Sequence, residues 1–195
     1  MANLALESLR LVVRDLDEAE LRWALIGGLA VSARAEPRFT RDVDVCVVVP
    51  DDATAERSVL QLGRRGYGVL SIVEHQQAGR LATVRLAAPG VAGVVVDLLF
   101  ASSGIEPEIV QDAEPLELLP ELIVRVARVP HLVVLKLLAR DDRTRPQDGA
   151  DLLALRCVLT HTDQADIRRL AQLVCARGFH RERDLVALAD DYLAG

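Results

Sequence analysis

The chain has 195 residues, with 23 basic and 29 acidic side chains and a formal net charge of −6 at pH 7. This charge balance argues against a protein that coats nucleic acid with its whole surface. Hydrophobic residues make up 51% of the chain and aromatic residues only 3%, so the core must be built from Leu, Val, Ala and Ile. The length suits one domain, or one domain with a helical extension.

The sequence shows no signal for a membrane or for an oxidising compartment. No apolar stretch approaches the ~20 residues that cross a bilayer, and MANLALESLR has no basic region ahead of a long apolar run. Cys46, Cys157 and Cys175 are odd in number and lie far apart in apolar surroundings. We expect them to be reduced core residues rather than disulfide partners or zinc ligands. These features predict a cytoplasmic protein that makes no membrane contact.

Charge is unevenly distributed along the chain. Residues 1–129 carry 13 basic and 19 acidic groups, whereas residues 130–183 carry 10 and 7. A basic face next to an acidic centre could hold a polyanion such as RNA. The other interpretation, slightly favoured by the abundance of arginine, is a solvated helical surface.

In chain order, the first half predicts an alternation of helices and strands. Apolar residues recur at helical spacing over 4–21, and a short apolar run at 23–26 predicts a strand that Gly27-Gly28 ends. A helical segment over 29–34 and a β-branched strand over 42–49 follow. A helix is then expected over 51–65, since Asp51-Asp52 can cap it and Gly66 can end it. Further strands are predicted at 67–73, 81–88 and 93–100.

The second half begins with irregular sequence and ends in helices. Residues 101–120 contain Ser102-Ser103-Gly104 and three prolines, which predicts a loop. A strand-like piece over 122–129 leads to helical patterns at 131–141, 147–159, 164–177 and 182–193. We therefore predict an α/β (α+β) fold, with a mixed sheet and flanking helices in residues 1–129. A C-terminal helical region, residues 130–195, would pack on that core.

The segment between Trp23 and Val49 carries the clearest chemistry. Gly27-Gly28 would expose backbone N–H groups at a helix start, where a phosphate can approach closely. Asp42 and Asp44 lie on one face of their strand because side chains alternate. The two carboxylates repel one another, and a bound Mg²⁺ would remove that repulsion. Taken separately, a glycine pair is more often a simple turn and an Asp-x-Asp more often a solvated strand edge.

The joint pattern resembles a known superfamily. GG-x-A with Ala30, followed by Arg38-x-Thr40-x-Asp42-x-Asp44, is similar to the signature of the DNA polymerase β-like nucleotidyltransferases. It is most similar to the abortive-infection AbiEii and minimal-nucleotidyltransferase groups of bacterial toxin–antitoxin systems. The resemblance covers about residues 20–155. It implies a nucleotidyltransferase-like sheet and a metal-dependent enzyme that moves an NMP from an NTP such as ATP to a hydroxyl.

Asp97 is the single charge in the apolar segment GVVVDLLF. It is either a strand-end acid that reaches solvent or part of a site, because an isolated buried carboxylate is costly. In the resembled superfamily a third acidic residue lies on such a later strand. The resemblance therefore implies that Asp42, Asp44 and Asp97 are catalytic and hold Mg²⁺ or Mn²⁺.

Lys136 is the single lysine among 23 basic residues and lies in the apolar segment HLVVLKLLA. Its charge must reach water or face an anion. This segment, with Arg145-Pro146-Gln147-Asp148 and Asp151-Leu152 after it, resembles the family's C-terminal lysine and aspartate motif. The resemblance implies that Lys136 is catalytic and contacts the triphosphate, with Asp151 preferred over Asp148 as a supporting acid. For Asp148 alone, a helix N-terminal acid that interacts with the helix dipole is the favoured interpretation.

The resemblance also implies a nucleotide-binding set: Gly27, Gly28, Arg38, Thr40, Lys136 and Asp151. Arg38 would bind phosphate or Asp44, and Arg41 would point to solvent. AbiEii-like toxins imply an RNA acceptor such as a tRNA end, minimal nucleotidyltransferases imply a protein hydroxyl, and antibiotic-modifying relatives imply a small molecule. A cognate toxin or antitoxin is an expected partner. The alternative from another class is a non-catalytic protein that keeps the fold and binds a partner, against which the intact carboxylates argue.

Overall fold

The computed structural model of the chain describes residues 4–75, 79–91, 93–141 and 146–195. Within them, the strands form one seven-stranded mixed sheet in the order β3-β4-β5-β2-β1-β7-β6. β2 pairs antiparallel with β1 and parallel with β5, and β7 pairs parallel with β1. The strands are β1 (Arg22–Ile26), β2 (Asp42–Val48), β3 (Gly68–His75), β4 (Arg80–Ala87), β5 (Val95–Leu99), β6 (Glu114–Leu119) and β7 (Leu122–Val126).

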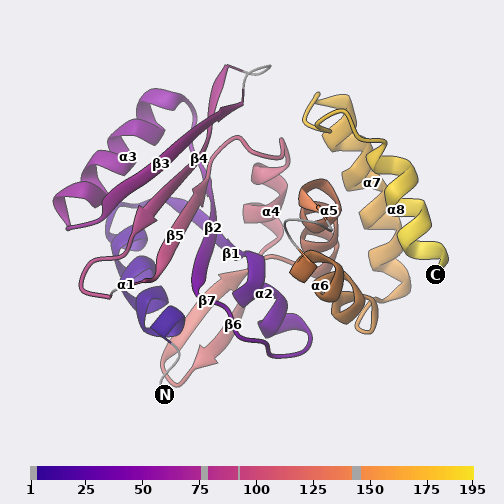
Figure 1. The fold of residues 1–195 in the computed structure, drawn as a ribbon, viewed down its shortest axis with the longest axis horizontal. Coiled ribbons are helices and arrows are strands. Elements are labelled where there is room, and N and C mark those ends of the chain that lie inside the picture. Colours follow the sequence, from indigo (N-terminus) through magenta and orange to yellow (C-terminus); the bar gives the residue numbers. More distant parts are fainter. Residues whose placement is uncertain (1–3, 76–78, 92, 142–145) are drawn as a thin grey trace.

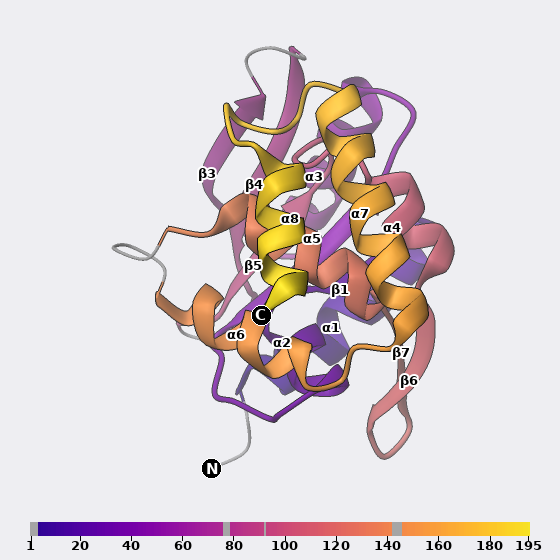
Figure 2. The ribbon, with the colours of Figure 1, turned by 90° about the vertical axis from the view of Figure 1, so that its right-hand side faces the viewer.

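Helices cover both faces of the sheet and extend beyond one of them (Figure 1). The helices are α1 (Leu4–Glu18), α2 (Gly27–Arg34), α3 (Asp52–Arg64), α4 (Glu106–Asp112), α5 (Val129–Ala139), α6 (Pro146–Arg156), α7 (His161–Ala176) and α8 (Leu185–Ala194). Figure 1 shows α1 and α3 on one face, with α2, α4 and α5 on the other. Figure 2 looks onto α7 and α8, which run side by side and contact α5.

Side-chain alternation along β2 explains the two layers. Val43, Val45 and Val47 are fully buried. Their face is shared by Trp23, the register partner of Val47, whose indole donates to Asp17 of α1. The opposite face of β2 carries Asp42, Asp44 and Cys46, and the Cys46 thiol contacts a backbone carbonyl of α4. The two aspartates therefore lie on the side of the sheet where the C-terminal helices gather.

The expected strands and helices are present with small boundary shifts, except in residues 101–120. That segment was expected to be a loop, and this prediction is wrong: it contains α4 and the edge strand β6. Each proline lies at a position where its missing backbone N–H breaks no helix or sheet hydrogen bond. Pro107 lies in the first turn of α4, Pro115 on an edge strand and Pro120 in the β6–β7 turn. A high proline content therefore does not indicate a loop when the prolines occupy such positions.

All three cysteines are free thiols. Cys46 is buried, but Cys157 is exposed just after α6, so the expectation that it belongs to the core is wrong. None of the helices in the described part of the chain has the length and apolar character needed to cross a membrane.

Candidate active site

The glycine pair forms the first turn of α2, directly after β1. Gly27 has φ +65°, a conformation that favours glycine, and a β-carbon there would lie 2.0 Å from Asp44 Oδ2. A β-carbon on Gly28 would lie 2.7 Å from Arg38 Nη2 and 3.0 Å from Thr40 Oγ1. A predicted metal ligand, Asp44, and two predicted nucleotide-binding residues, Arg38 and Thr40, thus fill the space that the two glycines leave. Both glycines are needed for this close packing at the N-terminus of α2.

The three predicted acids share one face of two neighbouring strands. Asp44 of β2 is the register partner of Asp97 of β5, and Asp42 precedes Asp44 by two residues. On its other side Asp97 is paired with Arg85 of β4. The Arg85 guanidinium binds both carboxylate oxygens, at 2.9 Å from Nε to Oδ1 and 2.7 Å from Nη2 to Oδ2. Hydrogen bonding to Asp97 raises the pKa of Arg85, with smaller contributions from Asp42 and Asp44.

The three acids carry the donor atoms that a divalent metal prefers, but Arg85 occupies one of them in this structure. Carboxylate oxygens on one face are the ligands that Mg²⁺ and Mn²⁺ prefer. Asp97, however, has both oxygens on Arg85. As the side chains stand, no group of three or more His, Cys, Asp or Glu residues in the described part of the chain has the arrangement of a metal site.

Lys136 faces anions, not solvent. Its ammonium lies 2.7 Å from Asp148 Oδ1 and 2.8 Å from Asp151 Oδ2, and both aspartates are almost fully buried. Arg38 binds the same Asp151 with two hydrogen bonds of 2.5 and 2.8 Å, and it is this acid rather than Asp44 that holds Arg38. Burial alone would raise the pKa of Asp151, but hydrogen bonds from Arg38 and Lys136 lower it. This network ties α5 and α6 to the loop before β2.

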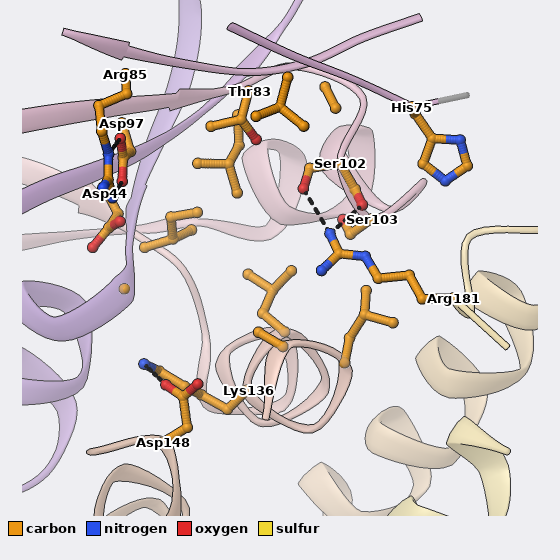
Figure 3. Close-up of a pocket in the computed structure, with 18 of the residues that line it drawn as sticks. Asp44, His75, Thr83, Arg85, Asp97, Ser102, Ser103, Lys136, Asp148 and Arg181 are labelled. Atoms are coloured by element: carbon orange, nitrogen blue, oxygen red, sulfur yellow. Dashed lines mark hydrogen bonds and ion pairs between the residues drawn. The ribbon is translucent and has the colours of Figure 1, made fainter. Parts of the chain in front are cut away.

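Gly27, Lys136 and several of the acids line one cleft of about 850 Å³ (Figure 3). Asp44, Asp97 and Arg85 form one wall, with Lys136 and Asp148 below them. An adjoining hollow of about 500 Å³ is lined by Gly28, Arg38, Thr40 and Asp42 in addition to the same acids. Most predicted site residues therefore open onto connected space. Asp151 lines neither space: it is almost fully buried and binds Lys136, which lines both. Arg145 of the C-terminal motif lies outside the described residues.

The far end of the cleft contains residues that sequence analysis did not assign to the site. Ser102, Ser103, His75 and Arg181 line it (Figure 3). Arg181 donates to the Ser102 carbonyl and hydroxyl oxygens at 3.0 and 3.1 Å. Arg85 was also missed as a site residue. The alternation of side chains along β4 could have shown which face of the strand Arg85 occupies. Its pairing with Asp97 could not be read from the sequence, because it depends on the register between β4 and β5.

Comparison with known proteins identifies a family and a shared fold. The family model described as "Nucleotidyl transferase AbiEii toxin, Type IV TA system" matches residues 10–191. An antigenic nucleotidyltransferase-like protein from Paracoccidioides brasiliensis has a similar structure, with a TM-score of 0.53, 17% identity and coverage of 96% of this chain and 92% of that one. The antibiotic-resistance factor ANT(2'')-Ia aligns with a TM-score of 0.50, 16% identity and coverage of 100% and 94%. No curated protein matches the sequence.

At these identities the two solved structures show a shared fold only. The family match carries more, because it spans most of the chain, from α1 to α8. It extends well past residue 155, where the resemblance of individual motifs ends. The chain belongs to the AbiEii family of nucleotidyl transferase toxins.

Proposed function

We propose that this protein transfers an NMP from an NTP to a hydroxyl acceptor, with release of pyrophosphate, in a reaction that depends on a divalent metal. We further propose that it acts as the toxin of a toxin–antitoxin pair, with a cognate antitoxin protein as its partner. The family match supports nucleotidyl transfer and the toxin role. The observation that carries the mechanism is Asp44, which packs on the first turn of α2 and faces Asp97.

The N-terminus of α2 is the proposed place of the phosphates. Backbone N–H groups and the helix dipole favour an anion at a helix N-terminus, and the glycines allow a close approach. Asp42, Asp44 and Asp97 would hold Mg²⁺ or Mn²⁺, which would neutralise the triphosphate and lower the pKa of the attacking hydroxyl. Much of the catalysis would then be positioning and charge neutralisation.

Lys136 is proposed to contact the triphosphate from the opposite wall of the cleft. Its side chain is 12% exposed, and it lines both the cleft and the adjoining hollow. Asp148 and Asp151 hold the ammonium in place, so the lysine is positioned before the nucleotide arrives. Arg38 supports the same arrangement by binding Asp151.

The acceptor is proposed to enter at the far end of the cleft, near Ser102, Ser103 and Arg181. An RNA end such as that of tRNA is the first candidate, and a protein hydroxyl is the second. A small hydroxylated molecule is the third, because the fold is shared with an antibiotic-resistance factor.

The test is transfer of an α-labelled NTP to three acceptor pools: total tRNA, total protein and aminoglycosides. Wild-type protein should label one pool, and Asp44→Asn should not, since it keeps the size of the side chain but removes the charge. Asp190→Asn is the matched control, because Asp190 is an exposed acid paired with Arg168 of α7. Equal labelling by wild type and Asp44→Asn would overturn the proposal.

A further inference from the structure

Arg85 is a cation placed among the acids of the proposed site. It reaches across from β4 and binds both oxygens of Asp97, whose side chain is only 10% exposed. The Arg85 side chain is itself 46% exposed and lines both the cleft and the adjoining hollow. Its guanidinium therefore stands at the boundary between the buried acid and the space where a nucleotide would bind.

The position of Arg85 explains how three acids can share one face of a sheet. Asp42, Asp44 and Asp97 would otherwise repel each other, and Arg85 interacts electrostatically with all three. A guanidinium is always charged and its fork matches a carboxylate, so it is a stable counter-ion in the absence of any other cation. A divalent metal and Arg85 are thus alternative partners for the same carboxylate.

We propose that Arg85 is a resident counter-ion that holds Asp97 in the nucleotide-free protein, releases it when metal and nucleotide bind, and then contacts the nucleotide's phosphates. The inference rests on the proposed function, because it assumes that Asp97 is a metal ligand. A phosphate group suits the released fork as well as a carboxylate does. Arg85 is then a positioning residue for Asp97 in one state and a phosphate contact in the other.

Competition for Asp97 predicts that removal of Arg85 strengthens metal binding. Mn²⁺ binding to the nucleotide-free full chain would be measured by electron paramagnetic resonance for wild type, Arg85→Gln and Arg80→Gln. Arg80 lies on the same strand and binds Asp52 at 2.6 Å, away from the cleft, so it is the matched control. Arg85→Gln should bind Mn²⁺ about tenfold more tightly than wild type, because one adjacent positive charge is lost. Arg80→Gln should bind as wild type does.

The second measurement is the affinity for a non-hydrolysable NTP analogue at saturating Mn²⁺. Here Arg85→Gln should bind about tenfold more weakly, because a charge-assisted contact is missing. The two effects have opposite signs, which a purely structural role of Arg85 would not produce. In an Asp97→Asn background, Arg85→Gln should change the Mn²⁺ affinity much less than in wild type, because the competition for Asp97 is gone and only the weaker interaction of Arg85 with Asp42 and Asp44 remains. If Arg85→Gln does not fold, Arg85→Lys keeps the charge but not the fork and should show both effects at smaller size.

Mn²⁺ affinity that is unchanged or weaker in Arg85→Gln would overturn the competition for Asp97. Tighter NTP binding would overturn the contact with the phosphates. Both failures are separable from failure of the proposed function, which is judged by α-phosphate transfer in wild type and Asp44→Asn. Absence of Mn²⁺ binding in every variant at millimolar concentration would overturn this inference and the metal dependence together.

Discussion

Gly27→Ala tests whether the glycine turn and the first acidic strand are built as one unit. An added β-carbon would lie 2.0 Å from Asp44 Oδ2, 2.4 Å from Cγ and 2.6 Å from Cβ. Rotation of the Asp44 side chain cannot clear this clash, because its own β-carbon is part of it. Either α2 or the start of β2 has to move, and both carry the proposed site.

The loss in the free energy of unfolding expected for Gly27→Ala has two components. An L-residue other than glycine at this positive φ costs about 1–2 kcal/mol, and overpacking costs roughly another 1–3 kcal/mol. Gly90→Ala isolates the first component, because Gly90 has φ +71° and nothing within 4 Å of the added β-carbon. Gly63→Ala, within α3 and also in open space, should instead stabilise the protein by about 0.5–1 kcal/mol.

Urea unfolding followed by circular dichroism gives the free energy of unfolding for each variant. The expected order of stability is Gly63→Ala, wild type, Gly90→Ala and then Gly27→Ala. If Gly27→Ala were as stable as Gly90→Ala, the contact with Asp44 would contribute nothing and the reasoning would be refuted.

Three further outcomes are expected. Lys136→Met should lower the free energy of unfolding by about 3 kcal/mol or more, because it leaves Asp148 and Asp151 buried with fewer cations. It should also weaken NTP binding about ten- to a hundredfold, and unchanged stability and affinity would remove Lys136 from the site. Burial lowers the pKa of His131 from 6.5 to about 4. Between these two pH values the imidazole is protonated in the unfolded chain but neutral in the folded one. Stability should therefore fall by about 3 kcal/mol as the pH drops from 6.5 to 4. His131→Gln should flatten this slope in urea titrations, and a persistent slope would contradict the assignment. Calorimetric NTP affinity should be much higher with Mg²⁺ or Mn²⁺ than without, and equal affinities would rule out the metal site.

The local part of the site was predictable because alternation along a strand is a local property. Asp42 and Asp44 share a face in any strand that contains both, and a charge within an apolar strand marked Asp97. The helix start at Gly27-Gly28 followed from the residues themselves. The helices after residue 130 followed from spacing, and the family match now includes them.

The partners of these groups were not predictable, because they come from distant parts of the chain. Arg85 meets Asp97 only through the register of β4 with β5, and Arg181 meets Ser102 across 79 positions. The sequence indicated that the Lys136 charge must reach water or face an anion, but not that Asp148 and Asp151 both bind it. Residues 101–120 were misassigned because composition does not reveal whether a proline lies in a helix's first turn or on an edge strand.

The most direct test of the proposed chemistry compares two labels on the same NTP. Wild-type protein with Mg²⁺ should transfer the α-phosphate label to the acceptor and release one pyrophosphate for each NMP transferred. The γ-label should appear only in pyrophosphate, and the Asp42→Asn/Asp44→Asn double variant should do neither while its melting temperature stays near or above that of wild type. Transfer of the γ-label to the acceptor, or wild-type transfer by the double variant, would contradict nucleotidyl transfer at these acids.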